Sequence, residues 1–210
     1  QMLDAGLYTK FPKPDYALAL HSDPLNAAGT LAYSEGLALA NSDTIDILVK
    51  GKGGHGAAPH LTIDPIVLAA RMILDFQTIV SRETDPLDPV VVTVGSIHGG
   101  TKHNIIPNEV KLQLTVRTTT TATRDRVLKA IDRIAKAAAL GANAPPPEVK
   151  VSLDEFTPAT YNDVPLSQKC GGLFREILGA DNVRLRKPVM GAEDFGRFSE
   201  GKTPIFMYFL

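Results

Sequence analysis

Two of the five histidines in this 210-residue chain stand where an imidazole could do chemistry. His55 lies in the glycine-rich stretch GKGGHGAAPH (51–60). Glycines on both sides permit unusual backbone angles and the close approach of a substrate, so we expect an exposed histidine rather than a core residue. The alternative is a loop histidine without a role. A phosphate-binding loop is disfavoured, because GKGGHG lacks the Gly-Lys-Ser/Thr ending.

His21 closes an apolar, strand-like run, ALALH (17–21). Ligands of α/β proteins bind at the carboxyl ends of the strands, and a neutral imidazole there could bind a metal. A structural histidine that caps the strand is an equally good interpretation of this residue alone. His21 is therefore a candidate metal ligand.

Two further polar residues could recognise an anion. Asn104 begins NIIP (104–107), and its amide can donate two hydrogen bonds. Arg117 ends an alternating run and is suited to a carboxylate, which it can bind through two hydrogen bonds. If the two lie close together, they predict a carboxylate site. The alternative for Arg117 is a surface salt bridge.

An acidic pair occurs in MGAEDF (190–195), where Glu193 and Asp194 begin a predicted short helix over 192–200. Acidic side chains are favoured at a helix start by the helix dipole, so simple capping explains them. The functional interpretation is that Glu193 faces a site opened by Gly191.

The elements that must position these residues follow a clear order. Runs with strand character cover 44–50, 90–97, 109–117 and 148–153, and runs with helical period cover 64–80 and 124–141. The order β-α-β-β-α-β predicts a ferredoxin-like unit with both helices on one face of the sheet and an open, polar opposite face. We place this unit at 35–155, inserted into an α/β domain that comprises 1–34 and 156–210.

Two packing expectations come from the same patterns. The apolar stripe of the helix at 64–80 is expected to contain Ile66, Ala70, Ile73 and Ile79, widened by Leu74 and Val80. The mostly apolar run 15–21 is expected to be covered on both faces of its sheet.

Composition excludes several classes of protein. The net charge of −1 gives no basic field for nucleic acid or for an anionic membrane, and no apolar run is long enough to cross a bilayer. The single cysteine, Cys170, rules out an internal disulfide framework. A reducing, cytoplasmic location is the expectation.

Several stretches together resemble one family. GKGGHGAAPH, DPIVLAARMILDFQTIVSRE, GGTKHNIIPNEVKLQLTVRT and MGAEDF are similar to the metal-dependent amidohydrolases that include aminoacylase, hippurate hydrolase and the plant auxin-conjugate hydrolases, relatives of the carboxypeptidase G type metallopeptidases. The resemblance covers almost the whole chain in the family's order. It implies a partial α/β catalytic domain with an inserted ferredoxin-like dimerisation domain, or lid, and a homodimer.

The resemblance also implies roles for the candidate residues. His21 matches a metal ligand, and His55 matches a histidine that reaches the partner subunit's active site and stabilises the oxyanion. Asn104 and Arg117 match positions that hold a substrate carboxylate, and Glu193 matches an acid that lines the site. The implied substrate is an N-acyl amino acid, and the implied cofactor is a pair of divalent metals such as Mn, Zn, Ni or Co.

Other family features are missing from this sequence. The resemblance implies a Cys-Gly-His-Asp stretch and a Glu-Glu pair upstream and a last histidine ligand downstream, and none is present. We therefore expect the chain to be a piece of a longer protein and to be inactive by itself. The alternative is a ferredoxin-like dimerisation or binding module without catalytic activity.

Overall fold

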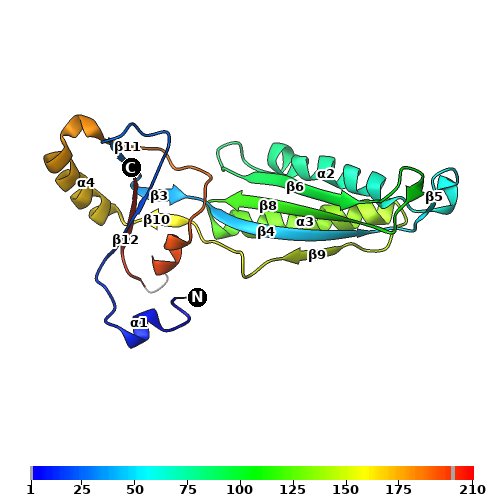
Figure 1. Cartoon of the computed structure of the whole chain (residues 1–210), viewed down its shortest axis with the longest axis horizontal. Coiled ribbons are helices and arrows are strands. Elements are labelled where there is room, and N and C mark those ends of the chain that lie inside the picture. The colour runs from blue at the N-terminus through cyan, green and yellow to red at the C-terminus, as the bar shows by residue number, and fades with distance from the viewer. Residues whose placement is uncertain (1, 200–201) are drawn as a thin grey trace. The chain divides into compact units, whose positions relative to one another are not determined.

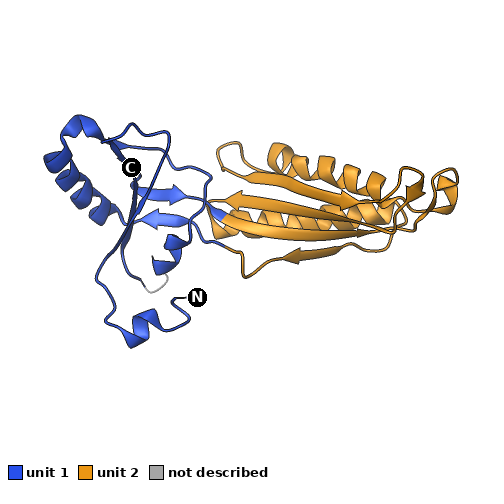
Figure 2. Ribbon diagram, viewed as in Figure 1, with its two compact units in different colours: residues 1–41, 157–210 blue, residues 42–156 orange. Residues whose placement is uncertain are grey.

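The computed structural model describes residues 2–199 and 202–210. The chain forms two compact units, which Figure 2 shows in different colours. Unit 1 comprises 1–41 and 157–210, and unit 2 comprises 42–156. The chain therefore enters unit 2 once and leaves it once. The domain boundaries given above stay a prediction.

Unit 2 is a four-stranded sheet with two long helices on one face (Figure 1). The spatial order of the strands is β6 (Val91–Gly99), β8 (Glu109–Thr118), β4 (Asn41–Lys50) and β9 (Glu148–Val151). The helices are α2 (Pro65–Arg82) and α3 (Thr121–Gly141), and the pairs β6–β8 and β4–β9 are antiparallel. This arrangement confirms the predicted ferredoxin-like plan.

Local signals explain where the two helices begin. The side chain of Asp64 accepts hydrogen bonds from the backbone N–H groups of Ile66 and Val67, and Pro65 occupies the first turn. The side chain of Thr120 accepts from the N–H of Thr123 in the same way at the start of α3.

The core of unit 2 lies between the sheet and the two helices. The helical period of the run 124–141 places Val127, Ile131, Ile134 and Ala138 in one row, and all four are buried. The predicted face of α2 is correct for Ile79, which is buried, and for Ile73, which packs against the core, but it is wrong for the exposed residues Ile66, Ala70, Leu74 and Val80. This helix buries Pro65, Leu68, Ala69, Met72, Phe76 and Ile79, whereas Leu74 is 70% exposed and Ile66 is 42% exposed. Apolar residues occur on two sides of α2, and the side with the bulky Met72 and Phe76 packs on the sheet.

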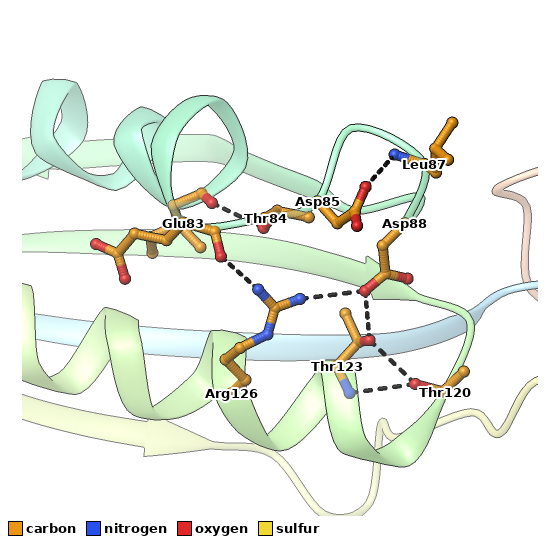
Figure 3. Close-up of polar contacts among 9 residues, drawn as sticks. Glu83, Thr84, Asp85, Leu87, Asp88, Thr120, Thr123 and Arg126 are labelled. Atoms are coloured by element: carbon orange, nitrogen blue, oxygen red, sulfur yellow. Dashed lines mark hydrogen bonds and ion pairs between the residues drawn. The ribbon is translucent and has the colours of Figure 1, made fainter.

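The connection between α2 and β6 is tied to the start of α3, as Figure 3 shows. The Asp88 carboxylate accepts hydrogen bonds from the Thr123 hydroxyl at 2.7 Å and from the Arg126 guanidinium at 3.1 Å. Arg126 also donates to the backbone carbonyl of Glu83. These bonds hold the loop against α3 and fix how β6 enters the sheet.

Unit 1 has a mixed four-stranded sheet and a separate antiparallel pair of short strands. The order of the sheet is β1 (Ala17–His21), β12 (Ile205–Phe209), β2 (Leu31–Tyr33) and β11 (Val183–Leu185). The pairs β1–β12 and β2–β11 are parallel, and β12–β2 is antiparallel. A second sheet pairs β3 (Gly36–Leu39) with β10 (Thr160–Asn162). The short remaining elements of unit 1 are α1 (Leu7–Lys10), η2 (Ala180–Asn182) and η3 (Asp194–Ser199), and those of unit 2 are β5 (Gly54–His55), η1 (Pro59–Leu61) and β7 (Ile105–Ile106).

The helix α4 (Val164–Leu178) covers part of one face of the unit 1 sheet. It contacts β11 and β12, and its core partners include Tyr33 and Phe206. The edge strand β1 stays uncovered on that face, where Leu18 is 51% and Leu20 is 54% exposed. The expectation that the run 15–21 is covered on both faces is therefore wrong for this chain.

Two other predicted elements of unit 1 are shorter than expected. The run VRLRKPV (183–189) has strand character and predicts a strand over its full length, but the strand ends at Leu185, and Val189 makes an isolated bridge to Leu39. The short helix expected over 192–200 is a 3₁₀ helix from Asp194 to Ser199, and residue 200 lies outside the described residues. No helix in the described part of the chain has the length and apolarity to cross a membrane.

Candidate functional site

His21 stands at the carboxyl end of β1 with one ring nitrogen already engaged. Its Nδ1 lies 2.6 Å from the carbonyl oxygen of Ser22. A carbonyl can only accept, so Nδ1 is the donor, and in the neutral imidazole the lone pair is on Nε2. That nitrogen is 4.0 Å from Oε2 of Glu193. Metal-binding histidines are oriented in this way, with the second nitrogen donating to a carbonyl or carboxylate.

Glu193 lies just before η3 and approaches His21. Its Oε1 accepts from the backbone N–H of Asp194 at 2.8 Å, and its own carbonyl accepts from the Thr160 hydroxyl at 3.4 Å. A hydrogen bond with the Asp194 side chain, together with partial burial, raises the pKa of the Glu193 carboxyl above its ordinary value. Glu193 thus bonds to the backbone of the first residue of η3 and lies beside His21.

These donors fit only part of a metal centre. Among the residues that the structure describes, no three or more His, Cys, Asp or Glu side chains gather into a group that could hold a metal ion. His21 supplies an imidazole nitrogen with the right tautomer, and Glu193 supplies a nearby carboxylate. Cys170 is part of α4 and packs, partly buried, against the core of unit 1, where burial raises the pKa of its thiol. We therefore derive no catalytic step through a metal from this chain alone.

His55 has the opposite tautomer. It lies in β5, opposite Ile105 of β7, and its side chain is exposed. The backbone N–H of Ala57 donates to Nδ1 at 3.1 Å, so Nδ1 is the acceptor and Nε2 carries the proton. His55 therefore presents an N–H donor to whatever faces it.

Asn104 lies beside His55 at the same tip of unit 2. The N–H of Gly56 donates to the Asn104 carbonyl at 2.8 Å. A Cβ at Gly56 would lie 3.1 Å from that oxygen, which explains why a glycine follows His55. The structure thus brings His55 and Asn104 together.

Arg117 is not part of this group within one chain. It lies near the far end of β8, where its Nε donates to the Thr115 hydroxyl at 3.2 Å. It is eight positions along the strand from Glu109, roughly 26 Å at the usual rise of an extended strand. Asn104 precedes Glu109, so the two predicted anion-binding residues stand at opposite ends of β8. Their shared role stays a prediction that needs a second subunit.

The polar face of the unit 2 sheet is open, as predicted. A groove of about 460 Å³ lies on it. On this face the Gln113 amide donates to Asp46 at 2.9 Å, and Lys50 binds Glu148 at 2.5 Å.

Sequence reasoning missed two ion pairs that hold functional or buried segments. Arg186 binds Asp23, two residues after His21, at 2.7 Å. Arg124 binds the fully buried Asp43 at 2.6 Å. A signal existed for the first pair, since Asp23 follows the end of a strand. The partners are far apart in sequence, so no local pattern connects them.

Comparisons with known proteins place these features in a family. The model of the M20 peptidase dimerisation domain matches residues 37–143, about half of the chain. N-acetyldiaminopimelate deacetylase of Bacillus pumilus is 37% identical over 212 residues, with 100% of this chain and 54% of the relative covered. Hippurate hydrolase of Campylobacter jejuni is 34% identical over 208 residues, with 99% and 53% covered.

A solved structure agrees with these matches. A dinuclear metal-binding peptidase of the M20 family from Bacillus subtilis has a TM-score of 0.74 and 26% identity, with 99% of this chain and 50% of that chain covered. The chain spans about half the length of the curated relatives it matches. The fold, the family match to unit 2 and the likeness to named amide hydrolases lead to one conclusion: this chain belongs to the M20 peptidase family through its dimerisation domain.

Proposed function

We propose that the whole protein hydrolyses the amide bond of an N-acyl amino acid with the help of divalent metals. The observation that carries the proposal is His21, whose free Nε2 faces Glu193 at the carboxyl end of β1. The relatives support the substrate class, because N-acetyldiaminopimelate and hippurate are both amides of amino acids. A pair of Mn, Zn, Ni or Co ions would supply the activated water when bound.

Five residues of this chain have separate roles in the proposed reaction. His21 binds metal and Glu193 lines the site. His55 donates its Nε2–H to the oxyanion of the tetrahedral intermediate, and Asn104 and Arg117 bind the free carboxylate of the substrate. The ten-residue strand β4 spans roughly 30 Å, so His55 sits far along unit 2 from the point where the chain enters it. This position favours a role for His55 in the active site of a partner subunit.

The partner is a second copy of the chain, and unit 2 offers a surface for it. β6 is an edge strand that pairs with β8 on one side. The neighbouring helix α2 exposes Val67 (58%) and Leu74 (70%), and Ile97 of β6 is 50% exposed. α2 packs against β6, and a Cβ placed on Gly100, just after β6, would lie 3.6 Å from Cδ1 of Ile66, so the helix and strand surfaces adjoin. An apolar patch beside an open strand edge is suited to a two-fold contact with an identical copy.

Replacing Leu74 by glutamate should weaken the dimer. A charge in the centre of the patch must be desolvated on association, so we expect the dissociation constant to rise roughly ten-fold or more, about 1.4 kcal/mol. Sedimentation velocity of the 210-residue chain measures it. The matched control is Leu140→Glu on α3, since Leu140 is 82% exposed and lies outside the patch. Equal dissociation constants for the two variants would argue against this surface.

The metal role is tested in the whole protein with His21→Ala. The expected result is loss of bound metal, measured by elemental analysis, together with loss of hydrolysis of hippurate and N-acetyldiaminopimelate. The control is His98→Ala, because His98 is exposed on the unit 2 sheet. Full metal content in the His21 variant contradicts the proposal. If the wild-type whole protein binds no metal and hydrolyses neither substrate, the second candidate, a non-catalytic dimerisation module, is favoured.

A further inference from the structure

One peptide group holds the imidazole of His21. The carbonyl oxygen of Ser22 accepts from Nδ1 at 2.6 Å. The N–H of the same peptide, on Asp23, donates to the carbonyl oxygen of Leu210 at 2.6 Å. Because a peptide group is planar, holding its N–H also directs its C=O. The orientation of the Ser22–Asp23 peptide therefore determines which nitrogen of His21 carries the proton.

The side chain of Asp23 fixes this peptide from the other side. Its Oδ2 accepts from Arg186 at 2.7 Å, and its Oδ1 accepts from the N–H of Leu25 at 3.0 Å. Both members of the ion pair are largely buried, with 19% of the Arg186 side chain and 13% of the Asp23 side chain exposed. Such a pair has little room to rearrange, so it holds the turn in one geometry.

Arg186 also contacts the ring that lies beside His21. Its guanidinium carbon is 4.1 Å from the centre of the Phe209 ring. Phe209 is the register partner of His21, and the two ring centres are 5.9 Å apart. Arg186 thus contacts both neighbours of the His21 imidazole. One is the turn whose Ser22 carbonyl accepts the hydrogen bond from Nδ1, and the other is the Phe209 ring.

We propose that Arg186 and Asp23 are a positioning pair for His21. The ion pair holds the Ser22–Asp23 peptide in the orientation that keeps the proton on Nδ1 and leaves Nε2 free for a divalent metal. The metal assignment rests on the proposed function. The tautomer is a property of unit 1 itself, and it can be measured without any catalytic assay.

The test is the tautomer of His21 in the ¹⁵N-labelled 210-residue chain, read from long-range ¹H–¹⁵N correlation spectra at a pH at which imidazoles are neutral. The His21→Gln variant assigns the signal. The wild type should show the Nδ1–H pattern. Arg186→Met keeps an apolar stem over Phe209 but removes the charge, so we expect loss of that pattern and averaged nitrogen shifts. Arg186→Lys keeps a cation for Asp23 and should largely restore the pattern.

Arg184→Met is the matched control. Arg184 lies two residues before Arg186, in β11, but its guanidinium donates to Asn26 at 2.6 Å. This variant should leave the His21 tautomer unchanged. An unchanged Nδ1–H pattern in a folded Arg186→Met chain overturns the proposal. If Arg186→Met does not fold, Asp23→Asn decides, because it keeps the size of the side chain: averaged shifts support the positioning role, and an intact pattern contradicts it. If the whole protein proves not to be a hydrolase, these spectra are unaffected, so the positioning role and the proposed function can fail separately.

Discussion

Replacing Asp43 by alanine should lower the free energy of unfolding of unit 2 by about 3–5 kcal/mol, the usual cost of breaking a buried ion pair from one side. Asp43 is fully buried and accepts from Arg124 at 2.6, 2.9 and 3.0 Å. Without the carboxylate, the guanidinium of Arg124, only 18% exposed, keeps a charge with no comparable partner. Chemical denaturation of the 210-residue chain measures the change.

The same α3 helix provides the control for this prediction. Arg133 binds Glu83 at 2.6 Å, but its side chain is 58% exposed. Removing an exposed pair by Glu83→Gln should cost less than about 1 kcal/mol. A small effect of Asp43→Ala, equal to that of the control, would show that the buried pair does not stabilise the unit. The guanidinium of Arg124 also lies 4.4 Å from the centre of the Phe156 ring. Arg124 therefore contacts both ends of unit 2, which begins at Ser42 and ends at Phe156.

His55→Ala in the whole protein should lower kcat by roughly 10²–10³-fold, the range for losing one oxyanion donor. KM and metal content should change little, because the donor acts on charge that develops in the transition state. The exposed His55 side chain makes a single local bond, to Ala57, so folding should be preserved. Steady-state kinetics with hippurate measure the effect.

His60→Ala is the matched control, since His60 is an exposed histidine five residues further on, in η1. It should leave kcat unchanged. His55→Gln should retain part of the activity, because an amide can also donate a hydrogen bond. A kcat equal to that of the wild type in the His55→Ala variant would show that His55 does not stabilise the oxyanion.

The fold was predictable wherever the signal is local. The run VPLSQKCGGLFREIL (164–178) predicts a helix, and α4 spans the same residues, with Asp163 as its cap. The strand β8 alternates between buried and exposed residues as its sequence indicates. Caps and hydrophobic period act within a few residues, so sequence alone reports them.

The remaining features depend on contacts between distant segments. The buried face of α2 was predicted only in part, because both sides of the helix carry apolar residues, and only packing on the sheet selects one. The pairing of β5 with β7 joins residues about 50 apart, and it alone brings Asn104 next to His55. The candidate residues were identifiable by type and position. The tautomers of His21 and His55 depend on the backbone groups that face the two rings, which no sequence pattern reveals.

The most direct test of the account is subunit complementation. Whole protein carrying His55→Ala is mixed under exchange conditions with whole protein carrying His21→Ala, each inactive alone. In a mixed dimer, one metal site is intact and receives His55 from the partner. Random exchange should therefore restore about a quarter of the wild-type sites. Activity that stays at the mean of the two parent variants, in a sample shown to contain mixed dimers, would contradict the claim that His55 acts across the dimer.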